Sequence, residues 1–316
     1  MKILVGNTCD PYFVQHLDKN FTIIKISFDQ VHEYSNQTHV AVIDVSDAKI
    51  IAQLRAQGFR LIITKFYDEI LDDARGVYQE DGCLYLYARN WCRMHSATVW
   101  TNAQHNWLRA PSVPDKFFLM MMNLQREHRT RLFNITRPYH SHSLYSYVEQ
   151  GYYLPDDAPL STFKRGTSDQ HRYNPTWYEQ TAFSMVSEAR VKWPEKSATA
   201  RFVTEKTFKP IAFQHAFLVY GTAGTLDYLH EQGFETFGHV IDQSYDTIID
   251  HTERLVAINT VLKSLYHEYQ HGQQLFSDSL SREKILHNFY NFFDADKLQH
   301  LWKTEIINPI QEFLNA

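Results

Sequence analysis

The stretch KFFLMMMNLQREHRTRL, residues 116–132, joins an apolar run directly to an arginine-rich turn and a following helix. The run Lys116–Met122 is apolar on both faces, as a strand of a parallel sheet covered by helices must be. The polar turn then stands at the carboxyl end of that strand, where open α/β sheets bind their ligands. This stretch therefore predicts an α/β fold and a candidate site just after residue 122.

Toward the N-terminus the same alternation of strands and helices recurs. The segment Asp47–Gln57 has the apolar face of an amphipathic helix, and Gly58 supplies its stop. An aromatic-rich group, CLYLYARNW and then ATVW, completes this part of the chain. The short β-branched runs that we expect to form strands are Lys2–Val5, Phe21–Ser27, Val40–Val45 and Arg60–Thr64.

Toward the C-terminus two further strand units are expected, followed by helices to the end. The strands are Phe183–Glu188 and Ala216–Tyr220, with a helix at Thr225–Gln232 and a long loop at 151–180 between units. Helical patterning begins at about Thr247. The final helices expected are Ser281–Phe293 and Leu298–Phe313.

The proline-containing segment Leu108–Asp115 is the best linker between two α/β domains. We expect an N-terminal domain at 1–112, a second domain at 113–295 and a C-terminal helix at 296–316 that returns to the first. A cleft at the carboxyl ends of both sheets follows from this order.

Composition narrows the function classes. The 31 Lys and Arg against 36 Asp and Glu give a net charge of −5, so no overall basic field indicates nucleic acid. Only 11 glycines are present, and neither G-x-G-x-x-G nor G-x-x-x-x-G-K-[ST] occurs, which disfavours simple dinucleotide enzymes and Walker-type nucleotidases. Three cysteines without a C-x-x-C pair, no signal-like start and no long apolar span predict a soluble, cytoplasmic protein.

One pattern matches a zinc peptidase. His267, Glu268 and His271 form H-E-x-x-H, in which two histidines on one helix face bind zinc and the glutamate polarises water. The apolar stripe of this helix passes through Leu265, so both histidines are expected to point to solvent. Gly272 then ends the helix, and an imidazole in a last turn suits the helix dipole. We therefore expect a solvated helix end and no metal.

A second segment predicts an anion site. Residues 201–212, RFVTEKTFKPIA, place three cations and one carboxylate at the start of a helix. Helix starts expose unpaired backbone N–H groups that bind anions, and Arg201 and Lys206 would add charge-assisted contacts to a diphosphate. Glu205, in the first turn, would accept hydrogen bonds from ribose or sugar hydroxyls. Exposed surface charges on an amphipathic helix are the plainer alternative.

The cluster Arg126–Arg131 after the first quoted strand is a third candidate. A basic cluster that opens a helix at a strand's carboxyl end is also an anion site in the expected place. A solvated basic loop is again the plain alternative. A nucleic-acid contact is the other, since several arginines lie near one another in the sequence: Arg109, Arg126, Arg129, Arg131 and Arg137.

The second and third candidate segments also carry a family resemblance. The segment 202–250 resembles the donor-binding half of GT-B glycosyltransferases, and it is most similar to a group related to alpha-1,3-fucosyltransferases of bacterial surface-sugar loci and bacteriophages. The shared marks are [FY]-[VL]-[TS]-E-K before a helix, a strand ending in Gly, L-x-x-L-x-x-x-G-F-x-T-F and S-Y-D. Upstream, R-x-H-R and a strand ending in S/T-E also agree. The likeness covers residues 116–257.

The resemblance implies two Rossmann-like domains facing a cleft, and a nucleotide-sugar donor held without a metal or other cofactor. It places the donor diphosphate on Lys206 and Arg201, with Glu205 on ribose or donor sugar. The donor-binding residues that it implies are Arg126, His128, Arg129, Glu188, Arg201, Thr204, Glu205 and Lys206.

An inverting transfer needs a base near the acceptor hydroxyl. We expect it in the first domain, at Asp68 or Glu69 after the strand LIIT, with Asp10 as the rival. The acceptor first expected is a surface glycan or a lipopolysaccharide sugar. The alternative is a hydroxymethylated base in duplex DNA, with the arginines of 126–137 on phosphate and Trp91, Trp100 and Trp107 at a flipped base.

Overall fold

The computed structural model describes residues 2–6, 9, 11–26, 39–44, 48–64, 78–80, 82–86, 90–104, 113–154, 174–192 and 203–316. The chain divides into two compact units. The first comprises Met1–His95 together with Ala295–Ala316, and the second comprises Ser96–Asp294. The first unit is thus built from two separate pieces of the sequence.

The first unit contains a six-stranded sheet. The strand order is β2-β1-β3-β4-β6-β5, and all neighbours are parallel except β5 and β6. Apolar residues fill the strands because helices cover the sheet: Leu61, Ile62 and Ile63 are almost fully buried. The strands are β1 Lys2–Gly6, β2 Ile23–Ile26, β3 His39–Asp44, β4 Arg60–Thr64, β5 Tyr78–Glu80 and β6 Cys83–Leu86.

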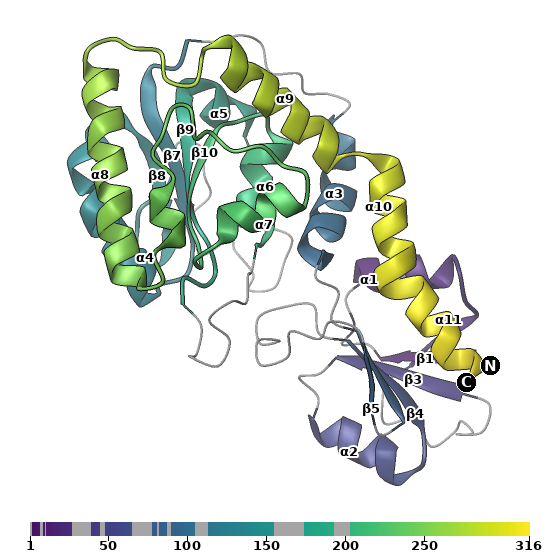
Figure 1. Ribbon diagram of the computed structural model, residues 1–316. Coiled ribbons are helices and arrows are strands. Elements are labelled where there is room, and N and C mark those ends of the chain that lie inside the picture. The colour runs from purple at the N-terminus through teal and green to yellow at the C-terminus, as the bar shows by residue number, and fades with distance from the viewer. Residues whose placement is uncertain are drawn as a thin grey trace. The chain divides into compact units, whose positions relative to one another are not determined.

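Helices lie on both faces of this sheet (Figure 1). Helix α2, Ala48–Ala56, packs Leu54 into a core formed with Leu4, Ala41 and Leu61. Helix α1, Pro11–Asp18, buries Phe13 against Trp91 with ring centroids 6.2 Å apart.

The C-terminal segment completes the first unit. It runs through α10, Ala295–Trp302, a π-helical turn at Lys303–Ile307 and α11, Asn308–Asn315. The Trp302 ring stacks on His16 at 3.8 Å, and the Glu305 carboxylate accepts a 2.6 Å hydrogen bond from the Asn90 side chain. These contacts join the last helices to the first sheet's unit.

The second unit contains a four-stranded, fully parallel sheet in the order β10-β9-β7-β8. The chain runs from β7 outward to β8 and then returns to β9 on the other side. The order of the strands therefore reverses between β7 and β9, which is the position where such sheets bind ligands. The strands are β7 Lys116–Met122, β8 Leu144–Tyr147, β9 Thr181–Ser187 and β10 Phe217–Tyr220.

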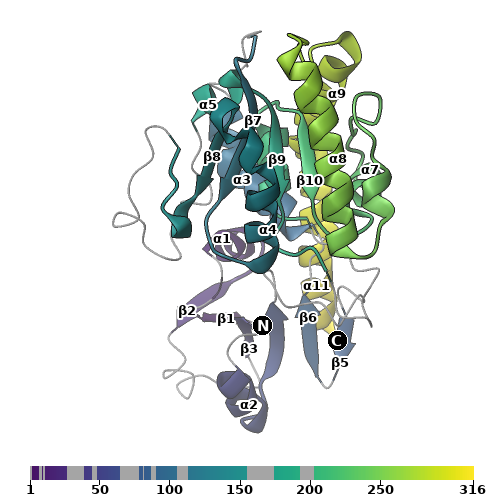
Figure 2. The ribbon, with the colours of Figure 1, turned by 90° about the vertical axis from the view of Figure 1, so that its left-hand side faces the viewer.

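Helices cover both faces of this sheet (Figures 1 and 2). One face carries α4 Glu127–Thr136 and α8 His251–Gln270. On the other face, Trp100 packs against Phe213 and Phe292, which lie at the end of α6, Glu205–Ala212, and in α9, Ser279–Phe292. The other helices of this unit are α3 Trp91–Gln104 (its first residues belong to the first unit), α5 Pro175–Gln180 and α7 Thr225–Glu231.

The α/β class, the two Rossmann-like parallel-sheet units and the helical C-terminus are confirmed. The cleft between domains stays a prediction. The stretch ATVW lies inside α3, where Trp100 packs in the core of the second unit. The segment 151–180 contains α5, and most of its remaining residues lie outside the described ranges, as does most of the predicted linker. Among the described helices, none combines the length and apolar character needed to cross a bilayer.

Candidate anion site at the carboxyl edge of the second sheet

Two helix starts meet beside the ends of β7 and β9. Arg126 is the N-cap residue of α4, which follows β7 after a short turn. Glu188 comes directly after β9, and Thr204 is the N-cap residue of α6. Each of these helices presents its N-terminal backbone N–H groups at the ligand-binding edge of the sheet, which favours anions.

The start of α6 is organised by the sequence T-E-K-T. The Thr204 side chain accepts a hydrogen bond from the backbone N–H of Lys206 at 3.3 Å, the usual N-cap interaction of threonine. Thr204 and Thr207 are 3% and 0% exposed, whereas Glu205 and Lys206 are only partly buried. The two threonines therefore fix the helix start, and the charged pair between them remains accessible.

Glu188 is enclosed by this helix start. Its side chain is 0% exposed and accepts hydrogen bonds from Thr204 N and Thr207 Oγ1 on Oε1, at 3.0 and 2.6 Å. Its Oε2 accepts from Thr204 Oγ1 at 2.6 Å and from Ala189 N at 3.1 Å. The resemblance implies that Glu188 is one of the donor-binding residues; in the structure its carboxylate is buried and held by these four donors.

The α4 side of the site is joined to the same strand end. Arg126 donates from Nη1 to the Ala189 carbonyl at 2.7 Å, and His128 Nε2 lies 3.1 Å from the Glu188 carbonyl. Burial and the positive Arg129 and Arg126 lower the pKa of His128 to about 4, although the hydrogen bond to Glu188 opposes them. His128 is therefore neutral at pH 7 and donates its Nε2 proton to that carbonyl.

Arg129 is a buried cation, 3% exposed, and lies close enough to Arg126 for their charges to interact. It donates from Nη1 to the Leu124 carbonyl at 3.1 Å, and its Nε meets no acceptor among the described residues. Burial and Arg126 lower its pKa, whereas Glu188 and Glu205 act in the opposite direction. Two carboxylates thus compensate a guanidinium that has few hydrogen bonds of its own.

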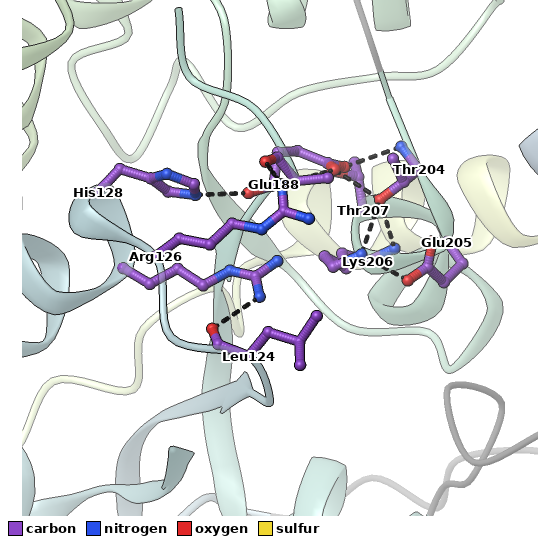
Figure 3. A network of polar contacts seen from close by, with 10 residues as sticks. Leu124, Arg126, His128, Glu188, Thr204, Glu205, Lys206 and Thr207 are labelled. Atoms are coloured by element: carbon purple, nitrogen blue, oxygen red, sulfur yellow. Dashed lines mark hydrogen bonds and ion pairs between the residues drawn. The ribbon is translucent and has the colours of Figure 1, made fainter. Parts of the chain in front are cut away.

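Lys206 and Glu205 form an ion pair, with 2.6 Å between Nζ and Oε1. Burial raises the pKa of Glu205, but the Lys206 charge and hydrogen bond, aided by Lys209, outweigh burial and hold it at about 2. Figure 3 shows Arg126 and His128 on one side, Glu205 and Lys206 on the other, and Glu188 between them. Cations from two helix starts therefore lie on either side of Glu188.

A cavity of about 190 Å³ adjoins Arg126. Most of its titratable side chains are basic, and it extends from the end of β9 to the start of α8. Its lining residues are Arg126, Glu127, His128, Ala189, Arg190, Val191, Lys192 and His251. A mostly basic depression therefore lies on the Arg126 side of the site, and Glu205 and Lys206 are not among its lining residues.

Most of the predicted donor-binding residues lie at the starts of α4 and α6 and just after β9: Arg126, His128, Arg129, Glu188, Thr204, Glu205 and Lys206. Asp10, Asp68, Glu69 and Arg201 lie outside the described residues, as do Trp107 and Arg109.

The expectation that Trp91 and Trp100 contact a flipped base is wrong. Each is 1% exposed, because Trp91 packs against Phe13 and Trp302, and Trp100 packs in the core of the second unit. These rings are structural. Arg131, at the α4 surface, pairs with Glu127 at 2.6 Å.

The H-E-x-x-H motif lies at the end of α8, where His267 is in the last turn and His271 is the C-cap residue. His267 and His271 are exposed, as the helical phase predicts, and His271 Nδ1 lies 2.7 Å from the His267 carbonyl. Within the described ranges no three metal-ligating side chains gather. The motif ends at a solvated helix terminus.

Sequence reasoning missed two residues that shape this edge. Thr207 binds the Glu188 carboxylate, and Asp246 accepts the Leu226 N–H at the start of α7. The second threonine of T-E-K-T was a usable signal, because a buried hydroxyl one turn after an N-cap requires a partner. Asp246 is the aspartate of the S-Y-D mark.

The chain bears a distant structural likeness to a known protein. No protein-family model matches the chain, and no curated protein matches it. A solved structure described as an alpha1,3-fucosyltransferase with GDP-fucose aligns over 94% of this chain and 91% of its own, at 12% sequence identity and a TM-score of 0.40.

Proposed function

We propose that the protein is a nucleotide-sugar-dependent glycosyltransferase of the GT-B type, and that its second unit binds the donor diphosphate. The observation that carries the proposal is the position of Arg126 and Lys206 at the starts of α4 and α6, with the buried Arg129 close to Arg126. The family resemblance of residues 116–257 supports the same assignment.

The chemistry of transfer requires such a group of cations. When the bond from the sugar to the diphosphate breaks, negative charge accumulates on the leaving nucleoside diphosphate. Fixed cations and helix N–H groups stabilise that charge more in the transition state than in the ground state. Lys206 and the guanidinium of Arg126 supply the cations, and the α6 start supplies N–H groups.

Glu205 has a separate role in the proposal. Its pKa of about 2 keeps it ionised at physiological pH, so it accepts hydrogen bonds but donates none. A carboxylate beside the phosphate-binding lysine suits a ribose or sugar hydroxyl. The Lys206–Glu205 pair would thus contact both the charged and the hydroxylated part of one donor.

The finer features are also proposals. We infer an inverting, metal-independent reaction in which Asp68, Glu69 or Asp10 of the first unit is the base, and Arg201 adds to the diphosphate contacts. The acceptor is a hydroxyl of a surface glycan or lipopolysaccharide sugar.

Donor binding tests the proposal directly. Thermal shift and calorimetry with UDP-, GDP-, CMP- and TDP-sugars should identify one donor that stabilises the wild type. Lys206→Ala should weaken its binding by at least about tenfold, equivalent to one charge-assisted contact. Lys263→Ala is the matched control, because Lys263 is exposed about 18 Å along α8 from the start of that helix.

A protein that binds none of these donors, or a Lys206→Ala variant that binds as well as wild type, would overturn the assignment. Transfer from the stabilising donor is then assayed on glycan and on hydroxymethylated duplex DNA. Transfer to DNA alone would replace the glycan acceptor with the DNA acceptor.

A further inference from the structure

We propose that Glu188 is a positioning residue, which sets the start of α6 against the start of α4 and acts on the donor through that helix start, chiefly through Lys206. The inference rests on the proposed function, since it concerns the same diphosphate site. It assigns Glu188 a role without contact to the ligand.

The Glu188 carboxylate is fully occupied. Each oxygen accepts one backbone N–H and one threonine hydroxyl: Oε1 binds Thr204 N and Thr207 Oγ1, and Oε2 binds Ala189 N and Thr204 Oγ1. A carboxylate has about four acceptor sites, so these four donors fill them. With 0% exposure, the side chain has no lone pair left for a ligand.

Thr204 transmits this arrangement to Lys206. A hydroxyl has a single hydrogen, and Thr204 donates it to Glu188 Oε2. The lone pairs of the same oxygen then face the N–H of Lys206 at 3.3 Å, and its Nζ at 3.5 Å. The charge on Glu188 thereby fixes the direction of the N-cap hydrogen bond of α6.

The main chain of the same residue holds the other half of the site. The Glu188 carbonyl accepts from His128, and the next carbonyl, of Ala189, accepts from Arg126. Side chain and backbone together join the strand end to α6 and to α4. The separation between Lys206 and Arg126 is therefore set at residue 188.

Glutamine cannot replace glutamate here. Thr204 and Thr207 can rotate their hydroxyls to accept from an amide, but the N–H groups of Thr204 and Ala189 only donate. One of these N–H groups faces each carboxylate oxygen. With the NH₂ group at the Oε1 position of the Glu188→Gln variant, Thr204 N loses its acceptor. With the NH₂ group at the Oε2 position, Ala189 N loses its acceptor, and the Thr204 hydroxyl must accept from the amide and turn its hydrogen away, which disturbs the N-cap of Lys206.

The experiment measures binding of inorganic pyrophosphate, a diphosphate probe without nucleobase or sugar, by calorimetry. Glu188→Gln should raise the Kd about tenfold. In the double variant with Lys206→Ala, the added loss should be clearly smaller than tenfold, because a residue that acts chiefly through Lys206 then has only the N–H groups of the α6 start left to position.

Thr207 provides a second test that keeps the Glu188 charge. Thr207→Val removes the 2.6 Å hydrogen bond to Oε1 and should weaken pyrophosphate binding, whereas Thr207→Ser retains a hydroxyl and should restore it. Thr260→Val, on the exposed part of α8, is the matched control and should bind as wild type does. If Glu188→Gln does not fold, the Thr207 pair decides the inference.

The outcomes separate the two proposals. Lys206-dependent binding in wild type with unchanged binding in folded Glu188→Gln, or in Thr207→Val, overturns the positioning role alone. Additive losses in the double variant also overturn it, because Glu188 would then act independently of Lys206. A wild type that binds no pyrophosphate, or binds it without need of Lys206, overturns the diphosphate site and the inference with it.

Discussion

Glu188 and Asp246 are both buried carboxylates that hold a helix start, yet their surroundings differ. Glu188 holds α6 through donors on both oxygens. Asp246 holds α7 through Leu226 N on Oδ2 at 2.9 Å, and its carbonyl accepts from Gly224 N at 2.8 Å. Gly224, the N-cap residue of α7, has φ 74° and no side chain, so Asp246 supplies the missing cap.

The two acids differ in charge compensation. Burial raises the pKa of Asp246 to about 6, with the Leu226 hydrogen bond opposing it, Asp227 raising it further and Arg254 lowering it. Asp246 thus titrates in the folded protein, in a range where an ordinary aspartate is already ionised. The comparison teaches that a buried carboxylate can be held by donors on both oxygens, as in Glu188, or can keep a raised pKa where burial dominates, as in Asp246.

Removing Arg254, the cation near Asp246, should have the largest effect on the free energy of unfolding. Arg254 is 1% exposed and donates to the carbonyls of Val191 and Ile248. Arg254→Met leaves these carbonyls and the nearby carboxylate without their cation, so the free energy of unfolding should fall by about 3–5 kcal/mol. Urea denaturation measures it, with exposed Arg282→Met as the control. A loss under about 1 kcal/mol would contradict the compensating role.

Glu188→Gln should have the second-largest effect and should lower the free energy of unfolding by about 3 kcal/mol. One backbone N–H loses its acceptor inside the protein, and the two threonine hydroxyls must reorient. The same denaturation measurement applies, with Glu283→Gln on the exposed side of α9 as the matched charge removal. If Glu188→Gln and Glu283→Gln are equally stable, the four hydrogen bonds contribute nothing to stability.

Unlike the two preceding substitutions, which lower stability, Asp246→Asn should gain stability relative to wild type as the pH rises. The folded pKa of about 6 lies above the ordinary value of 3.8, so between about pH 4 and 6 the folded state binds more protons than the unfolded state. This group therefore lowers stability as pH rises through that window. Asparagine keeps an acceptor for Leu226 N and carries no charge.

The stability of Asp246→Asn relative to wild type should then increase by on the order of 2 kcal/mol between about pH 4 and pH 7. Thermal unfolding of both proteins across this range measures the difference. A difference that is independent of pH would show that Asp246 does not titrate in the folded protein.

A local cap should matter least. Asp278 caps α9 by accepting Ser281 N at 2.9 Å, and its side chain is 47% exposed. Water can replace this acceptor, so Asp278→Ala should cost about 1 kcal/mol. If Asp278→Ala lowered the free energy of unfolding as much as Glu188→Gln does, burial of the Glu188 carboxylate would add nothing to its effect on stability.

The sequence predicted the strands best where they are apolar on both faces. β7 has the predicted bounds, and β4 and β10 agree closely with theirs. A strand covered on both sides requires apolar residues along its whole length, and that run is easy to recognise. β8, LYSY, escaped notice because it is short and partly polar at the sheet edge. ATVW is rich in strand-forming residues, yet it packs as a helix in the core.

The location of the candidate site and its cationic residues could be predicted from the sequence, but the hydrogen bonds within the site could not. T-E-K after a strand unit and R-E-H-R after β7 identified the two helix starts. The role of Glu188 depends on contacts across 16 and 19 residues of sequence, which no local pattern encodes. Trp91 and Trp100 show the converse error, since composition alone does not distinguish a core tryptophan from a binding one.

The discontinuous first unit has a consequence for synthesis on the ribosome. Its sheet is translated first, but its last pieces, residues 295–316, are made only after the whole second unit. The second unit is continuous in sequence, so it can finish folding while the first still waits for Trp302 and α11. The part of the chain that is made first is therefore the part that matures last.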